Sequence, residues 1–219
     1  MSLLYGKKGV VMGVANDHSI AWGISKKLSD EGAELCFTYQ GESLHRRVKP
    51  LANSVKSNFL IECDVLKEGS VKKSFDEIGN HWGEIDFVLH SIAFSEKEEL
   101  KGKYLNTSRN NFSNTMLISC FSFTEVAHEA EKLMKNGGSL LTLTYDGSQK
   151  YIRNYNVMGV AKAALESSVR YLAADLGPSN IRVNALSAGP MKTLAMAGIS
   201  GGKDTVSYTH LTLPTNSNV

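Results

Sequence analysis

The feature that most constrains the fold is a repeated alternation of short apolar runs with longer segments of helical period. Six of these runs are expected to be strands, at residues 9–14, 34–39, 59–63, 85–91, 139–144 and 181–186. They are continuously apolar rather than alternating, which is typical of strands covered on both faces in parallel sheets. Strand–helix repetition in turn requires right-handed crossovers. The sequence therefore predicts an α/β fold, a doubly wound parallel sheet of the Rossmann type.

Five segments between these runs are expected to be helices, at residues 20–31, 43–55, 67–82, 109–135 and 154–175. Ser19 is a suitable N-cap for the first helix, and Gly32 is expected to end it. Pro50 predicts a break or kink in the second. In the last helix, apolar residues recur at helical spacing and form one continuous face, which predicts burial against the sheet.

Composition and charge exclude several classes of function. The 219 residues fit one domain, and a hydrophobic fraction of 42% suffices for a core. A formal net charge of +2 gives no electrostatic basis for binding nucleic acid or a membrane surface. We find no signal-peptide core and no apolar run of membrane-spanning length. The three cysteines, Cys36, Cys63 and Cys120, have no metal-ligand spacing, and an odd number suggests no disulfide framework. We therefore expect Cys36 and Cys63 to be small buried side chains of a cytoplasmic protein.

The turn after the first strand is a candidate phosphate site, because ligands of such sheets bind beyond the carboxyl ends of the strands. The segment 13–23 differs from the common three-glycine fingerprint of dinucleotide-binding folds. Small residues at Gly13, Ala15 and Ala21 would still let a pyrophosphate approach the backbone and the helix N-terminus. The alternative is an ordinary strand–helix turn.

The end of the second strand favours NADH over NADPH. Gln40 can bond ribose hydroxyls as donor and acceptor, although a solvated loop residue is the alternative. No Arg or Lys directly follows Tyr39 to take a 2′-phosphate. Arg46 and Arg47 keep NADPH open as the less favoured cofactor.

The ends of the third and fourth strands supply further candidates. Asp64 can accept from an adenine amino group while Val65 packs on the ring, or Asp64 can instead cap the next helix. His90, Ser91 and Ile92 end the fourth strand, where a nicotinamide is expected. We interpret His90 as a hydrogen-bonded structural histidine and not as a catalytic one.

Tyr155 and Lys162 form the candidate catalytic pair. They are seven residues apart, or two helical turns, and so share one face of the last helix. A neutral tyrosine can donate to a carbonyl as negative charge develops on it. A nearby ammonium can hold ribose hydroxyls and lower the cost of that charge. These properties indicate hydride transfer beside a nicotinamide.

The spacing of this pair distinguishes between reactions. Short-chain dehydrogenases pair their Tyr and Lys four residues apart, and here that position is Met158, which cannot donate to a carbonyl. The wider spacing resembles that of the bacterial NADH-dependent enoyl-acyl-carrier-protein reductases of the same superfamily. The segments that carry this resemblance are 13–23, 34–40, 63–65, 90–92, 155–162 and 182–194.

The resemblance implies reduction of a trans-2-enoyl thioester in fatty-acid elongation. It implies that Tyr155 bonds the thioester carbonyl, that Lys162 grips the nicotinamide ribose and that Tyr145 lines the substrate pocket and helps deliver a proton. It further implies acyl carrier protein as partner, a homotetramer built on residues 109–135 and 154–175, and no metal. The implied cofactor contacts are Gly13, Ala15, Ser19, Ile20, Gln40, Asp64, Val65, Ser91, Ile92, Lys162, Met191 and Thr193.

The chain departs from the family pattern at two places. Ala93 stands where glycine is common, which should tighten the nicotinamide pocket slightly. We expect residues 1–200 to form one dinucleotide-binding and catalytic domain, and residues 201–219 to be a non-native tail that replaces a lid, a helix and the final strand. On this interpretation the chain is weakly active or inactive. Two other hypotheses are a ketoacyl reductase and a catalytically silent nucleotide-binding protein.

Overall fold

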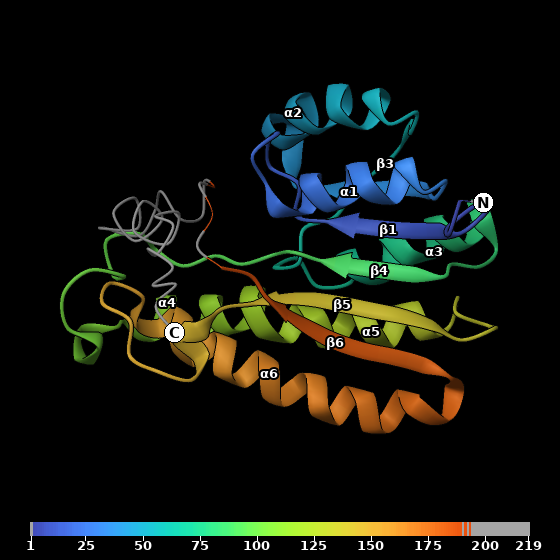
Figure 1. Ribbon diagram of the computed structural model, residues 1–219. Coiled ribbons are helices and arrows are strands. Elements are labelled where there is room, and N and C mark those ends of the chain that lie inside the picture. The colour runs from blue at the N-terminus through green and yellow to red at the C-terminus, as the bar shows by residue number, and fades with distance from the viewer. Residues whose placement is uncertain (1, 190, 192, 194–219) are drawn as a thin grey trace, which may run out of the picture.

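The computed structural model describes residues 2–189, 191 and 193, and its centre is a six-stranded parallel sheet (Figure 1). The strand order is β3-β2-β1-β4-β5-β6, with every neighbouring pair parallel. The prediction of a doubly wound Rossmann-type sheet is confirmed. The strands are β1 (Lys8–Met12), β2 (Glu34–Tyr39), β3 (Phe59–Glu62), β4 (Phe87–His90), β5 (Gly138–Thr144) and β6 (Ile181–Ser187).

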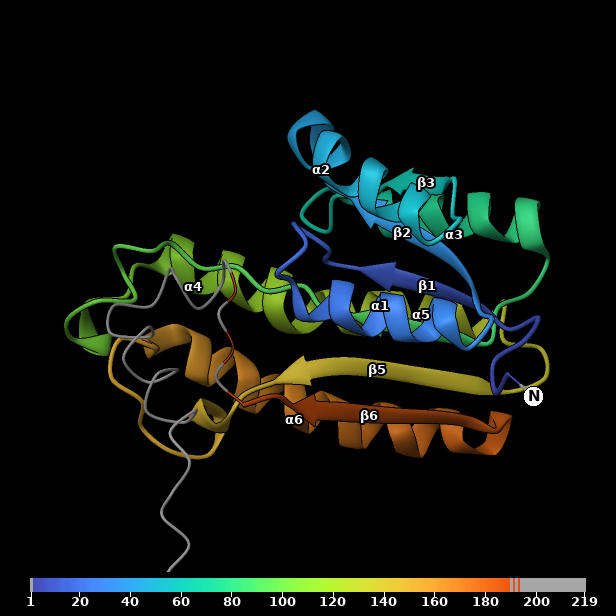
Figure 2. The ribbon, with the colours of Figure 1, turned by 45° about the horizontal axis from the view of Figure 1, so that its top comes forward.

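Helices cover both faces of the sheet. The core on one face joins the sheet to α1 and α2, and the core on the other joins it to α3, α5 and α6. Figure 2 shows β5 and β6 lying over α6 at one end of the sheet. The α-helices are α1 (Ile20–Asp30), α2 (Gly41–Ser54), α3 (Ser70–Trp82), α4 (Arg109–Met116), α5 (Ser122–Glu131) and α6 (Asn156–Leu176). The short helical segments are η1 (Tyr104–Asn106), η2 (Leu117–Phe121), η3 (Asp146–Ser148) and η4 (Gly177–Ser179).

Three helices differ from the sequence-based expectation. The segment expected as one helix over 109–135 is α4 and α5 joined by the π-helical segment η2. Helix α3 begins at Ser70 and not at residue 67, because Gly69 adopts a left-handed conformation with φ of 76°. Helix α2 runs through Pro50 and ends at Ser54, so the predicted break there is wrong.

The carboxyl ends of the strands form the edge at which ligands bind. β1 pairs with β2 on one side and β4 on the other, so the order of the sheet reverses between β1 and β4. Such a switch point leaves a crevice beyond the strand ends. Among the residues that the structure describes, no helix is long and apolar enough to span a membrane.

Candidate active site

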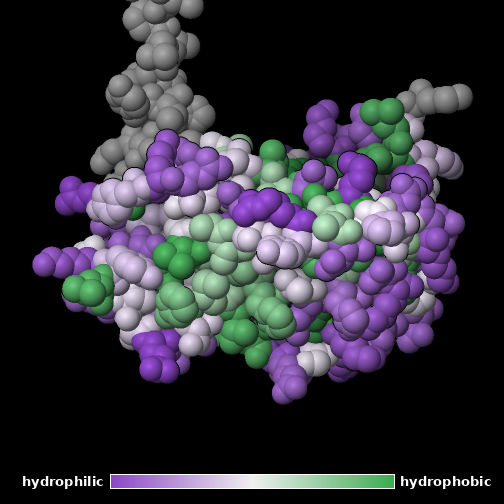
Figure 3. Space-filling view, turned by 90° about the horizontal axis from the view of Figure 1, so that it is seen from below, coloured by the Kyte–Doolittle hydropathy of each residue, from purple (hydrophilic) through white to green (hydrophobic). Residues whose placement is uncertain are grey.

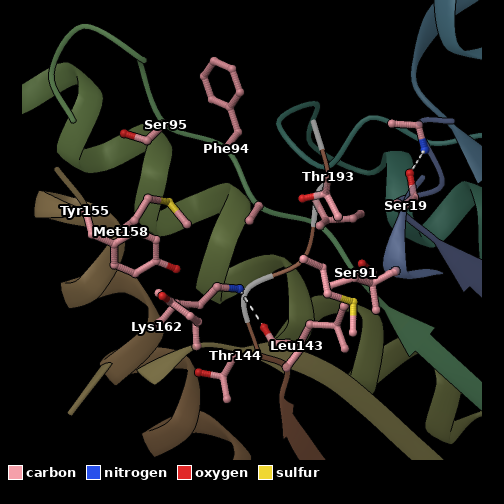
Figure 4. A pocket seen from close by; sticks show the side chains of 18 of the residues that line it. Ser19, Ser91, Phe94, Ser95, Leu143, Thr144, Tyr155, Met158, Lys162 and Thr193 are labelled. Carbon is pink, nitrogen blue, oxygen red and sulfur yellow. Dashed lines mark hydrogen bonds between the residues drawn. The ribbon is translucent and has the colours of Figure 1, made fainter. Parts of the chain in front are cut away.

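A pocket of about 480 Å³ opens at this switch point (Figure 4). Most of the residues predicted for the site line it: Gly13, Ala15, Ser19, Ile20, Ser91, Ile92, Tyr145, Tyr155, Lys162, Met191 and Thr193. Figure 4 shows Tyr155, Met158 and Lys162 on one side of the pocket and Ser19 on the other. The strand order therefore brings together side chains from both halves of the sequence.

The floor between β1 and β4 has no room for a side chain at Gly13. A Cβ built on this residue would lie 2.0 Å from the carbonyl oxygen of Ser91, and its φ of 96° is one that other residues rarely adopt. The Ser91 amide also donates to the carbonyl of Met12 at 3.0 Å. The two strand ends thus approach backbone to backbone, which leaves peptide groups exposed to a ligand.

Ser19 holds the turn between β1 and α1. It occupies the predicted N-cap position, but its hydroxyl makes no cap bond to α1. Instead it accepts from the backbone N–H groups of Ala15 at 3.0 Å and Asn16 at 3.1 Å. The turn is therefore fixed by its own serine, and the N-terminal amides of an eleven-residue helix lie beside the pocket.

Tyr155 immediately precedes α6 and is only 7% exposed. Burial raises the pKa of its hydroxyl, with a further contribution from Tyr145, so at neutral pH the group is a neutral hydrogen-bond donor. The flanking residues Asn154 and Asn156 have positive φ angles of 60° and 35°, which asparagine tolerates better than most side chains. The Asn156 side chain also donates to the carbonyl of Glu99 at 3.1 Å. The backbone that presents Tyr155 is thus held in one conformation.

Lys162 extends from α6 to the end of β5. Its ammonium donates to the carbonyl oxygen of Leu143 at 2.7 Å (Figure 4). Burial lowers the pKa of Lys162 to about 8, while Cys120 and Glu166 oppose that shift. The side chain is therefore largely cationic at pH 7, and two of its three donor protons remain for other partners.

Tyr145 packs edge-on against Tyr155, with ring centroids 5.3 Å apart. The loop that carries it passes directly over the Tyr155 ring, because a Cβ on Gly147 would lie 2.5 Å from that ring. A Cβ on Gly159 would in turn lie 2.7 Å from the carbonyl oxygen of Gly147. The two tyrosines therefore sit in a closely packed unit formed by the β5–α6 loop and the first turn of α6.

A further wall of the pocket, formed by the chain after β4, contains Phe94, which is half exposed, and Ser95, Lys97 and Leu100. Ser119 of the π-helical segment holds this wall: its hydroxyl accepts from the Phe94 N–H at 3.0 Å and contacts the Phe94 carbonyl at 3.1 Å. The same hydroxyl lies 3.8 Å from the sulfur of Met158. The π-helical turn, which holds one residue more than a turn of α-helix, thus places the buried Ser119 hydroxyl against the loop after β4.

His90 is a fully buried structural residue, as predicted. Its Nδ1 lies 3.2 Å from the Thr142 hydroxyl and its Nε2 2.9 Å from the Ser122 hydroxyl. Burial, reinforced by the charge of Lys162, lowers its pKa to about 3. The imidazole is consequently neutral at physiological pH. Cys36 and Cys63 are also buried as predicted.

Three predicted cofactor residues do not line the pocket. Gln40 is exposed at the start of α2, and Asp64 and Val65 follow β3, on the half of the sheet beyond β1. The Asp64 carboxylate accepts from the Leu66 N–H at 3.0 Å and does not cap α3. All three lie at the same carboxyl edge of the sheet, where the adenosine half of a dinucleotide binds in such folds.

Sequence reasoning missed several residues that shape the site. Leu143 contributes only a carbonyl, which side-chain chemistry cannot reveal. Ser119 acts across 25 residues on Phe94. Glu166 lies one helical turn beyond Lys162 and bonds the loop after β5, so its i+4 spacing was the one available signal. Within the part of the chain that is described, no cluster of metal-ligating side chains is present.

The family model for enoyl-(acyl carrier protein) reductase matches residues 13–219 of this chain. An enoyl-[acyl-carrier-protein] reductase [NADH] of Rhizobium meliloti is 63% identical over 206 residues, which cover 94% of this chain and 77% of that protein. The crystal structure of FabI from Candidatus Liberibacter asiaticus superposes with a TM-score of 0.94 at 54% identity, covering 100% of this chain and 85% of that one.

The enoyl-(acyl-carrier-protein) reductase from Anaplasma phagocytophilum, solved in complex with NAD, superposes with a TM-score of 0.92 at 52% identity, covering 97% of this chain and 81% of that one. Sequence, fold and pocket geometry agree, so the predicted resemblance is confirmed. The protein is a member of the NADH-dependent enoyl-acyl-carrier-protein reductase family.

Proposed function

We propose that this chain reduces the trans-2 double bond of enoyl-acyl-carrier-protein thioesters with NADH, as a step of fatty-acid elongation. The observation that carries the proposal is the joint presence of Tyr155 and Lys162 in the pocket at a spacing of seven residues. Met158 lines the same pocket where a ketone-reducing tyrosine would stand, and its thioether has no proton to donate. This disfavours the ketoacyl reductase alternative.

The residues of the pocket fit a nicotinamide dinucleotide. The bare backbone at Gly13 and the N-terminal amides of α1 suit a pyrophosphate, with Ala15, Ile20 and Thr193 beside them. Lys162 is placed to hold the ribose. Ser91, Ile92 and the backbone of Met191 would surround the nicotinamide, and Gln40, Asp64 and Val65 the adenosine. No basic residue directly follows Tyr39, so NADH remains favoured over NADPH.

When bound, the dinucleotide supplies a hydride to the β-carbon of the enoyl thioester. Tyr155 donates a hydrogen bond to the thioester oxygen, where negative charge gathers as the substrate becomes an enolate. The raised pKa of Tyr155 keeps the proton on the phenol, so the residue stabilises the enolate as a neutral hydrogen-bond donor. Lys162 adds a cation near the same oxygen. Tyr145, packed on Tyr155, lines the acyl side and assists delivery of a proton from solvent to the α-carbon, which converts the enolate to the saturated thioester.

An apolar surface supports a homo-oligomer, for which we propose the tetramer implied by the family. Figure 3 views the molecule from the side of α6 and shows hydrophobic residues gathered across the middle of that face. The helices α4, η2 and α6 carry exposed apolar side chains at Phe112, Leu117, Phe121, Val160 and Tyr171. These belong to the two segments in which the tetramer interface is expected. We further propose the cytoplasm as location.

Substitution of Tyr155 by Phe tests the proposed reaction. We expect kcat/KM for a short trans-2-enoyl thioester to fall by roughly 100-fold or more, because one donor to the developing oxyanion is lost. NADH affinity, followed by nicotinamide fluorescence, should remain within about threefold, since the ring itself is retained. Tyr5→Phe, at a tyrosine that is 85% exposed, is the matched control.

The same assay separates the alternatives. A β-ketoacyl thioester offered in parallel should not be reduced, and its turnover in place of the enoyl substrate would establish a ketoacyl reductase. NADH binding without turnover of either substrate would support the silent nucleotide-binding hypothesis. Comparing NADH with NADPH at equal concentration settles the cofactor preference.

The division at residue 200 remains a prediction, because residues 194–219 lie outside the described part of the chain. We propose that residues 201–219 do not contribute to catalysis. A variant that ends at residue 200 should then match the full chain in NADH binding and turnover, whether that turnover is weak or strong. A loss of either property would contradict the proposal.

A further inference from the structure

Glu166 lies behind the catalytic pair and has no role in the mechanism described above. It sits on α6 one turn beyond Lys162, and one carboxylate oxygen accepts from two hydroxyls, Thr144 at 2.7 Å and Ser148 at 2.5 Å. Burial opposes its ionisation, but the hydrogen bonds from Ser148, Thr144 and Gln149, with the charge of Arg170, prevail and lower its pKa. The group is therefore an anion at neutral pH.

The two hydroxyls belong to the two ends of one short segment. Thr144 is the last residue of β5 and Ser148 the last residue of η3. Between them lie Tyr145 and Gly147, which pack on the Tyr155 ring. A single carboxylate thus ties both ends of the loop that carries Tyr145 to the helix that carries Lys162.

The same carboxylate acts on Lys162 through its charge. An anion one turn away stabilises the ammonium and raises its pKa, against the lowering effect of burial. Cys120 on the π-helical segment also acts on Lys162, and Lys162 in turn lowers the pKa of His90 on β4. Glu166 is the carboxylate among these groups, and the hydroxyls of Thr144 and Ser148 connect it to the loop that lines the pocket.

We propose that Glu166 is a positioning residue of the reductase: its carboxylate fixes the Tyr145 loop against Tyr155 and places a negative charge one helical turn from Lys162. This inference rests on the proposed function for its effect on rate. Its structural part, the anchoring of residues 144–148, does not depend on which substrate is reduced.

Two variants separate the two roles. Glu166→Ala removes the acceptor, and we expect kcat for a trans-2-enoyl thioester to fall roughly tenfold or more, because small displacements of catalytic groups are costly. Glu166→Gln keeps an acceptor oxygen but loses the charge. It should retain most of the rate near pH 7 and move the alkaline limb of the kcat/KM profile to lower pH. Glu125→Gln, at a partly buried carboxylate of α5, is the matched control.

Hydrogen exchange supplies a readout without turnover. Amides of residues 144–158 should exchange faster in Glu166→Ala than in the wild type. Their exchange rates in Glu125→Gln should equal those of the wild type. An unaltered exchange pattern overturns the proposal, as does an unaltered kcat and pH profile in Glu166→Ala, or an equal loss in the Glu125 control. If the wild type reduces no enoyl thioester, the proposed function fails, and the exchange comparison alone then decides on the anchoring.

Discussion

At the scale of the residue, the site depends on side chains whose ionisation is set by burial. Lys162 is 6% exposed and loses much of its hydration, yet it keeps a backbone partner and a nearby carboxylate. Tyr155 is shielded to a similar degree and stays protonated. His90 is fully enclosed and neutral, with a hydroxyl on each ring nitrogen. Among the described residues that line the pocket, Lys162 is thus the buried cation, whereas Lys97 is exposed.

The buried neutral state of His90 predicts a specific dependence of stability on pH. The pKa of His90 is about 3 in the folded protein, against 6.5 for an unperturbed histidine such as that of the unfolded chain. Between these two pH values the unfolded chain therefore binds a proton that the native chain does not bind. This contribution to the free energy of unfolding is present above pH 6.5 and is lost as the pH falls toward 3, by about 1.4 kcal/mol per pH unit.

Urea unfolding at several pH values measures this effect. His90→Asn should lack that part of the slope, while His128→Asn, at an exposed histidine of α5, controls for the loss of an imidazole. A wild-type imidazole resonance that does not titrate between pH 8 and 5, and that disappears in His90→Asn, would identify the group directly. A full titration of that resonance near pH 6.5 would refute the prediction.

At the scale of the element, the strands could be predicted from sequence because burial on both faces imposes a continuous apolar run. The candidate catalytic pair was also predictable, since Tyr155 immediately precedes the helix that carries Lys162 and their spacing is local, although Tyr155 lies just before that helix and not on it as expected. The π-helical turn at Leu117–Phe121 left no comparable signal, because it is stabilised by contacts with Phe94 and Met158, which are distant in sequence. Ser119 was missed for the same reason.

The close packing of the β5–α6 loop predicts intolerance of one added methyl group. Gly147→Ala would place a Cβ 2.5 Å from the Tyr155 ring, although the backbone there is open to any residue. We expect a loss of about 1–3 kcal/mol in stability from overpacking and a roughly tenfold or greater loss in kcat/KM from displacement of the ring. Gly177→Ala, where a Cβ meets nothing within 4 Å, is the control. Wild-type kinetics in Gly147→Ala would show that the ring does not depend on this contact.

At the scale of the whole molecule, the order of the strands decides what meets at the pocket. The reversal between β1 and β4 brings the Gly13 turn next to Ser91, and β5 brings the Lys162 partner Leu143 beside them. This arrangement followed from the strand–helix alternation, so the position of the site was predictable. The sequence could not predict which of the candidate residues line the same pocket. Gln40 and Asp64 differ from Ser19 only in their place along the carboxyl edge of the sheet.

The apolar face over α4, η2 and α6 predicts self-association. Phe121 is 49% exposed, and a charge placed there would have to be desolvated in any interface that covers it. Phe121→Glu should therefore shift the molar mass measured by light scattering toward that of the monomer, with an unchanged circular dichroism spectrum. Leu66→Glu, at a leucine of similar exposure far from α6, should leave the mass unchanged. A monomeric wild type would contradict the proposed tetramer.

The bond from Lys162 to the Leu143 carbonyl has a consequence for the selectivity of cofactor capture. A free lysine gives up about 2 kcal/mol of rotamer entropy when it is immobilised. Here the Lys162 side chain loses that rotamer entropy during folding, because a hydrogen bond of 2.7 Å to the Leu143 carbonyl fixes the ammonium before any ligand binds. In the proposed contact with Lys162, a ribose with correctly placed hydroxyls would meet a rigid donor, whereas the side chain would not move to a new position for a deoxyribose. We therefore expect the enzyme to distinguish the sugars of its cofactor more sharply than a mobile lysine would allow.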